Sequence, residues 1–210
     1  MYDLSAFNEE GILEQSLDKT AKEYRLYDPG WYLYRMIINF PGNKISSDFI
    51  ELVYVTLCAW NMNSRGAKLS EYDIFEESIV SHKGVIDKLG NWKINDLAQN
   101  SDVREFLKDL FFSLTLVAPG KPPLVTFSKA IHFFLPHLVV PIDRKYTLSY
   151  FTGNTGINPC KEKQFSMFYN IQEEFSCFAS ENNLEKFKDN RWNLTIPKVL
   201  DNMIIGFMKL

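Results

Sequence analysis

Three ionisable side chains, Lys129, His132 and Asp143, lie within the segment 124–151, whose sequence is LVTFSKAIHFFLPHLVVPIDRKYTLSYF. Lys129 and His132 are three residues apart, so a helix places them on neighbouring parts of one face. Asp143 follows two prolines, Pro136 and Pro141, which restrict the backbone before it. A carboxylate held at such a turn can act as a general base or stabilise a cationic transition state.

Asp143 also has a purely structural interpretation. An aspartate directly before a helix accepts hydrogen bonds from free backbone N–H groups and suits the positive end of the helix dipole. The two roles are compatible, because one carboxylate oxygen can cap the helix while the other takes part in chemistry. The sequence leaves both interpretations open.

A second polar group follows the apolar segment 49–60 and has the sequence WNMNSRGAK, from Trp60 to Lys68. Its amides, including Asn63, and its cations, Arg65 and Lys68, could bind a phosphate or a base edge, and Trp60 could stack on a base. Alternatively, Trp60 belongs to the core and the residues 63–66 only end the preceding helix, with a glycine in the left-handed conformation.

The two polar segments could face one cleft. Arg144 and Tyr146 directly follow Asp143 and would then contribute a further cation and a further ring. The candidate nucleic-acid-binding residues of this hypothesis are Trp60, Asn63, Arg65, Lys68, Lys129, His132, Arg144 and Tyr146.

Apolar residues at helical spacing, divided by proline and glycine, predict an all-α fold of several helices packed into one domain. For the segments 31–40 and 49–60 a buried strand remains an alternative, because both are short and apolar. We expect helices over residues 8–27, 31–40, 49–60, 71–81, 103–117, 129–135 and 162–182, another after Asp143, and a last one capped by Thr195.

The size of the chain fits a single domain covering residues 1–210. Hydrophobic residues make up 46% of the sequence and aromatic residues 15%, which is enough for a large core and excludes a disordered chain. The clearest break is at residues 118–123, APGKPP, because two consecutive prolines stop a helix. If the domain has two helical lobes, we expect them to divide there.

Composition and motifs exclude several classes of function. The balance of 23 Lys and Arg against 26 Asp and Glu gives a net charge of -3, without the overall basic field of many nucleic-acid-binding proteins. The sequence lacks GxGxxG, GxxxxGK[ST], HExxH and GxSxG motifs. Its three cysteines form no CxxC pair, and its three histidines are poorly spaced for a metal. We therefore expect neither a metal nor a cofactor.

The sequence predicts a cytoplasmic protein that does not enter a membrane. Acidic residues lie near the N-terminus, where a secretion signal needs a basic start. No stretch approaches the roughly 18 apolar residues that a membrane-spanning helix requires.

Residues 118–151 resemble the core of the helix-hairpin-helix DNA glycosylases. The likeness rests on Pro119-Gly120, then a helix, then an apolar Val-Pro-Ile-Asp143 that opens another helix. The resemblance implies an all-α enzyme that excises bases from DNA, with Asp143 as the catalytic carboxylate. The family's nucleophilic lysine would fall near Leu124 or Val125, and Lys129 lies about a turn later. The resemblance therefore implies a monofunctional member or a relative that has lost the chemistry. The family's iron–sulfur cysteines are also missing, so no cofactor is expected.

Two hypotheses about function follow. In the first, the chain processes DNA and Asp143 opens into a pocket that receives an extruded base. In the second, the chain is a non-enzymatic helical module that binds a protein partner or nucleic acid, and Asp143 is a cap without a cleft. The acidic net charge fits a protein partner better than DNA in that second case.

Overall fold

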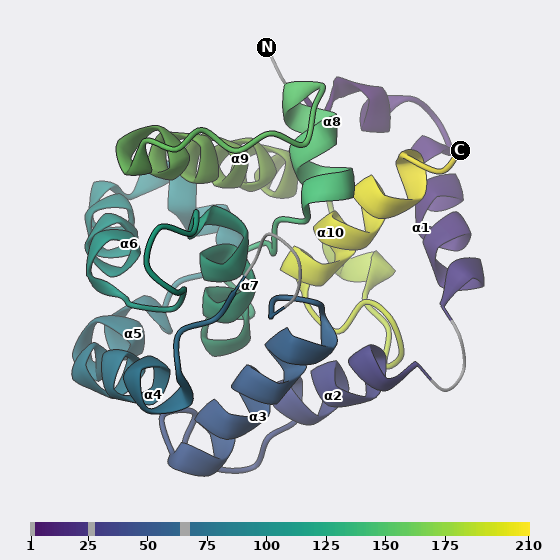
Figure 1. Ribbon diagram of the computed structural model, residues 1–210. Coiled ribbons are helices and arrows are strands. Elements are labelled where there is room, and N and C mark those ends of the chain that lie inside the picture. Colours follow the sequence, from purple (N-terminus) through teal and green to yellow (C-terminus); the bar gives the residue numbers. More distant parts are fainter. Residues whose placement is uncertain (1–2, 25–27, 64–67) are drawn as a thin grey trace.

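The computed structural model describes residues 3–24, 28–63 and 68–210. In these residues the chain forms helices joined by loops, with one isolated antiparallel bridge between Leu69 and Val117 and no strand. The predicted all-α, multi-helix fold is therefore confirmed (Figure 1).

The α-helices of the described residues follow one another along most of the chain. They are α1 (Ile12–Glu23), α2 (Pro29–Ile38), α3 (Ser47–Ala59), α4 (Tyr72–Ser81), α5 (Lys83–Leu89), α6 (Ser101–Ser113), α7 (Leu124–Phe134), α8 (Ser149–Thr152), α9 (Lys161–Glu181) and α10 (Ile196–Phe207). Short helical turns add η1 (Ser5–Asn8), η2 (Ile94–Gln99), η3 (Arg144–Leu148) and η4 (Leu184–Phe187).

The two segments for which a strand remained possible are the helices α2 and α3. Each begins at a side-chain cap: Asp28 accepts a hydrogen bond from the Trp31 N–H, and Ser46 accepts one from the Phe49 N–H. Such caps satisfy N–H groups that a helix leaves unpaired at its start. Asn61, with φ 61°, has the left-handed conformation just beyond α3, which the sequence analysis had assigned to Gly66. Gly66 itself lies outside the described residues.

Helix α7 runs through the centre of the molecule, and all of its residues are buried (Figure 1). The predicted start at residue 129 is wrong, because the helix begins at Leu124, directly after Pro123. The Ser128 hydroxyl does not cap this helix. It donates to the Val125 carbonyl and accepts from the Ile142 N–H, which ties α7 to the segment that leads to Asp143.

The first and last helices lie side by side, α1 in purple and α10 in yellow in Figure 1. The Thr20 hydroxyl on α1 donates to the Asn202 carbonyl on α10 at 2.7 Å. Gly206 of α10 faces the backbone of Ser16 so closely that a Cβ would lie 1.8 Å from its carbonyl oxygen. The absence of a side chain at Gly206 therefore permits the contact between the two helices.

The buried hydrophobic residues on both sides of residues 118–123 belong to one cluster. Phe111 precedes this loop, and its ring contacts Phe127 and Phe168 beyond it, with centroids 4.8 and 6.2 Å away. Over the ranges that the structure describes, no helix combines the length and apolarity needed to cross a membrane.

Candidate active site

Asp143 lines a cavity of about 490 Å³ that is bounded by α2, the end of α3, α7, η3 and α10. This volume lies within the range of small-molecule binding sites. We call the cavity the Asp143 pocket and define it by its charged residues and its rings: Asp28, Lys129, Asp143, Lys198 and Asp201, with Tyr24, Trp31, Tyr34, Trp60 and Tyr146.

The Asp143 carboxylate is held through both of its oxygens. Its Oδ1 accepts hydrogen bonds from the backbone N–H groups of Lys145 at 2.7 Å and Tyr146 at 3.3 Å. Its Oδ2 accepts one from the Lys129 ammonium at 3.2 Å. The turn that follows is π-helical, with a bond from the Leu148 N–H to the Asp143 carbonyl at 2.8 Å. The predicted cap is confirmed, and the second oxygen is turned toward the only cation of α7 in the pocket.

Asp143 is ionised at neutral pH. Burial acts to raise the pKa of this carboxyl, but the Lys129 ammonium and the two backbone N–H groups outweigh burial and lower the pKa below its usual value. The Asp143 side chain is 33% exposed, whereas that of Lys129 is 8% exposed. The carboxylate is thus the more accessible member of the pair.

A second ion pair lies deeper, on α10. The Lys198 ammonium is 2.5 Å from Asp201 Oδ2, and both side chains are only 6% exposed. Burial opposes the charge on Lys198, but Asp201 and the tyrosines Tyr24 and Tyr34 outweigh it and raise the pKa of the ammonium. The ammonium also lies 5.7 Å from the ring of Tyr34, 5.9 Å from Trp60 and 6.0 Å from Tyr24.

This second pair was not predicted from the sequence, in which the last helix is expected only as an element capped by Thr195. The available signal was the presence of Lys198 and Asp201, three residues apart, in the otherwise apolar sequence IPKVLDNMIIGF. Charged residues on a buried helix are rare unless they are paired, so this spacing indicates an ion pair in the interior.

Trp60 lies in the wall of the pocket and also packs on the core. Its indole N–H donates to the Gly30 carbonyl at 3.4 Å, and its ring stacks on Tyr34 at 5.9 Å. The Lys129 ammonium lies 5.7 Å from the centre of the same ring. Trp60 therefore packs on the core as the first interpretation expects, and it also lines the pocket, so its binding of a base stays a prediction.

His132 does not line the pocket, and the expectation that it contacts nucleic acid is wrong. It is fully buried behind Tyr34, where the two rings are parallel and 5.6 Å apart. Nδ1 donates to the Val139 carbonyl at 2.6 Å, so Nε2 is the nitrogen that accepts from the Tyr34 hydroxyl at 2.9 Å. Burial lowers the pKa of His132 to about 3. The neutral imidazole of His132 thus accepts a hydrogen bond from the Tyr34 hydroxyl and packs parallel to its ring.

The other predicted binding residues are dispersed. Arg144 is exposed and donates from Nε and Nη2 to the Thr155 carbonyl, at 3.1 and 2.8 Å. Asn63 and Lys68 are exposed but do not line the pocket, and Arg65 lies outside the described residues. Tyr146 does line it. The structure thus brings Trp60, Lys129, Asp143 and Tyr146 together, while the expected grouping of the cations around Asp143 holds for Lys129 alone among the described residues.

No family model, curated protein or solved structure matches the chain. In the ranges 3–24, 28–63 and 68–210, no cluster of three or more His, Cys, Asp or Glu side chains is placed to hold a metal ion. The chemistry of the site therefore has to be argued from the geometry of the pocket.

Proposed function

We propose that this chain excises a base from DNA by hydrolysing the N-glycosidic bond, as a monofunctional enzyme resembling the helix-hairpin-helix glycosylases. The observation that carries the proposal is the position of Asp143. An ionised carboxylate, fixed by two backbone N–H groups and one ammonium, lines a cavity whose walls are aromatic rings.

The chemistry requires stabilisation of a cationic sugar. When the C1′–N bond breaks, its electron pair leaves with the base and the sugar becomes positively charged. The Asp143 carboxylate stabilises this charge and accepts a proton from the water whose oxygen forms the new bond to C1′. Lys129 holds Asp143 in place as a hydrogen-bond donor, and an ammonium has no electron pair with which to attack the sugar.

The walls of the pocket suit a planar base. Trp60 and Tyr146, both partly exposed, line the pocket with aromatic surface, and the ammonium of the Lys198–Asp201 pair lies 5.9 Å from the centre of the Trp60 ring. A base leaving with an extra electron pair is stabilised by such a charge in a site shielded from water. A base inside a duplex must first be extruded to reach the pocket.

The alternative is a non-enzymatic helical module that binds a protein partner or nucleic acid. That hypothesis requires Asp143 to be a cap without a cleft. The cavity of about 490 Å³ at Asp143, and the second buried ion pair in its wall, favour the enzyme.

Replacement of the carboxylate tests the proposal. We expect Asp143→Asn to lower the rate of base excision at least about 100-fold, because the amide cannot stabilise the cation or accept the proton. Asparagine caps a helix as well as aspartate does, but it leaves the Lys129 ammonium without its counter-ion, so the unfolding midpoint of the variant is measured beside its activity. The measurement is cleavage at the abasic site, after alkali, in duplex and single-stranded oligonucleotides that carry a panel of modified bases.

The matched control is Asp96→Asn. Asp96 also caps a turn, with its side chain accepting from the Lys93 N–H at 2.8 Å, but it does not line the Asp143 pocket. Excision at the wild-type rate by Asp143→Asn would contradict the catalytic assignment. Strand breakage without alkali would contradict the monofunctional mechanism.

A further inference from the structure

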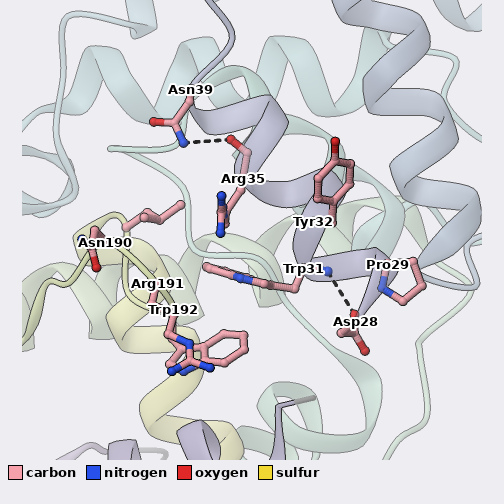
Figure 2. Close-up of a pocket in the computed structure, with 10 residues that line it drawn as sticks. Asp28, Pro29, Trp31, Tyr32, Arg35, Asn39, Asn190, Arg191 and Trp192 are labelled. Carbon is pink, nitrogen blue, oxygen red and sulfur yellow. Dashed lines mark hydrogen bonds between the residues drawn. The ribbon is translucent and has the colours of Figure 1, made fainter. Parts of the chain in front are cut away.

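A second, larger cavity opens on the surface beside α2 (Figure 2). It has a volume of about 930 Å³ and lies between α2 and the segment that precedes α10. We call it the Arg35 groove and define it by six lining residues: Tyr32, Arg35, Asn39, Asn190, Arg191 and Trp192.

The groove presents two guanidinium groups. Arg35 and Arg191 are both exposed, and neither belongs to an ion pair among the described residues. The Arg191 guanidinium lies over the Trp192 ring, 4.9 Å from the centre of the ring. Guanidinium groups are suited to bind phosphate through two parallel hydrogen bonds.

The nearby carboxylates are engaged by the backbone. Asp28 lines the groove, but its Oδ1 accepts from the Trp31 N–H at 3.0 Å (Figure 2). Asp189 precedes the groove, and its Oδ1 accepts from the N–H groups of Arg191, Trp192 and Asn193. Neither carboxylate forms an ion pair with Arg35 or Arg191 among the described residues.

The groove also offers a ring to stack on. Tyr32 lines the groove and is 61% exposed, so its ring is accessible to a ligand. The amides Asn39 and Asn190 lie on opposite sides of the groove, and each can both donate and accept hydrogen bonds (Figure 2). Rings, guanidinium groups and amides together are typical of surfaces that bind single-stranded nucleic acid.

The Arg35 groove and the Asp143 pocket adjoin each other. Asp28, Pro29 and Trp31 line both cavities, so the start of α2 is their common wall. A strand with one base in the Asp143 pocket would carry its neighbouring phosphates over this wall.

We propose that the Arg35 groove binds the single-stranded nucleotides next to the base in the Asp143 pocket, with Arg35 and Arg191 on phosphates and Tyr32 stacked on a base. This inference rests on the proposed function and narrows its substrate to DNA with an unpaired strand next to the excised base. It also accounts for a binding surface on a chain with a net charge of -3, because the required positive charge is local.

The test measures binding of a fluorescein-labelled single-stranded oligonucleotide by anisotropy over a range of NaCl concentrations. For Arg35→Ala/Arg191→Ala, we expect weaker binding and a slope of log K against log salt that is smaller by about 1.4, since each phosphate contact on a single strand contributes about 0.7. Tyr32→Ala should weaken binding and leave the slope unchanged, because stacking releases no counterions.

Arg104→Ala is the matched control. Arg104 is also an exposed arginine over a ring, 5.0 Å from the centre of Tyr169, but it is on α6, away from α2 (Figure 1). Its replacement should leave both the affinity and the slope at their wild-type values.

Three outcomes overturn the inference: no binding of the oligonucleotide by the wild type, an unchanged slope in the double variant, or displacement of the strand by a mononucleotide at equal concentration. None of these outcomes affects the comparison of Asp143→Asn with the wild type, which measures the rate of base excision. A different result is a wild type that binds the strand but excises no base, with strand binding lost in the arginine variants. That result would contradict the proposed function and leave the Arg35 groove as a strand-binding site.

Discussion

His132 is a titratable residue that the fold keeps neutral. Its pKa is about 3 in the folded protein, against an ordinary value of about 6.5 in the unfolded chain. Between these values the unfolded chain binds a proton that the folded protein does not, so stability falls as the pH falls. For this residue we expect a loss of about 2 kcal/mol in the free energy of unfolding between pH 7 and pH 5.

Urea unfolding of the wild type and of His132→Asn at pH 7 and at pH 5 measures how much of the pH-dependent loss of stability is due to His132. The asparagine amide can still donate to the Val139 carbonyl, so the variant should fold, and its stability should fall less with pH by about that amount. His137 also has a pKa lowered by burial, but it is present in both proteins and cancels. Equal pH dependence of the two proteins would show that His132 is protonated in the folded state.

At the scale of residues, the sequence predicts what a side chain can do at its own turn and misses what comes from far along the chain. The cap at Asp143 is a local contact with residues 145 and 146, and it was predictable. Lys198 joins the same pocket from the last helix, which no local pattern reveals. His132 resembled a binding residue by type, and only its burial assigns it a structural role.

Gly206 determines how closely α10 approaches α1. A Cβ at this position would lie 1.8 Å from the Ser16 carbonyl oxygen and 2.5 Å from the Thr20 hydroxyl oxygen. Backbone on a packed helix cannot yield as a flexible side chain can, so Gly206→Ala must separate the two helices. We expect thermal or urea unfolding to show a loss of about 3 kcal/mol, as in other overpacked cores.

Gly84→Ala provides the comparison. Gly84 lies on α5, and a Cβ there would meet no atom within 4 Å. Alanine favours the helix, so this variant should keep its stability or gain up to about 1 kcal/mol. A Gly206→Ala protein as stable as Gly84→Ala would mean that α1 and α10 are not in close contact.

Helices were predictable where apolar residues recur at three- and four-residue spacing along the sequence. The long helix expected over 162–182 is α9 (Lys161–Glu181), in which Phe165, Phe168 and Phe175 are buried. Helix α7 was expected to begin too late, because the hydroxyls of Thr126 and Ser128 resemble capping groups. Both are buried inside the helix instead, since α7 is covered on every side and its polar residues find partners in the interior.

At the scale of the molecule, the spacing of apolar residues predicted the all-α class and composition predicted a large core, but neither could say whether the proline-rich residues 118–123 divide that core. The contacts of Phe111 with Phe127 and Phe168 cross this loop. The N-terminal helix α1 packs on the C-terminal helix α10, so contacts that stabilise the fold join segments from opposite ends of the sequence. Such pairings follow from packing geometry, which hydrophobic periodicity alone does not determine.

A core shared in this way should unfold as a unit. We expect Trp92→Phe to unfold in urea with the same midpoint by tryptophan fluorescence and by far-ultraviolet circular dichroism. The remaining tryptophans, Trp31, Trp60 and Trp192, all line the two adjoining cavities and report on that side, whereas the dichroism reports on all helices. Coincident transitions are the test of a single cooperative unit. If the lobes on either side of residues 118–123 were independent, both signals would show two separate transitions, because Trp31 and Trp60 precede this loop and Trp192 follows it.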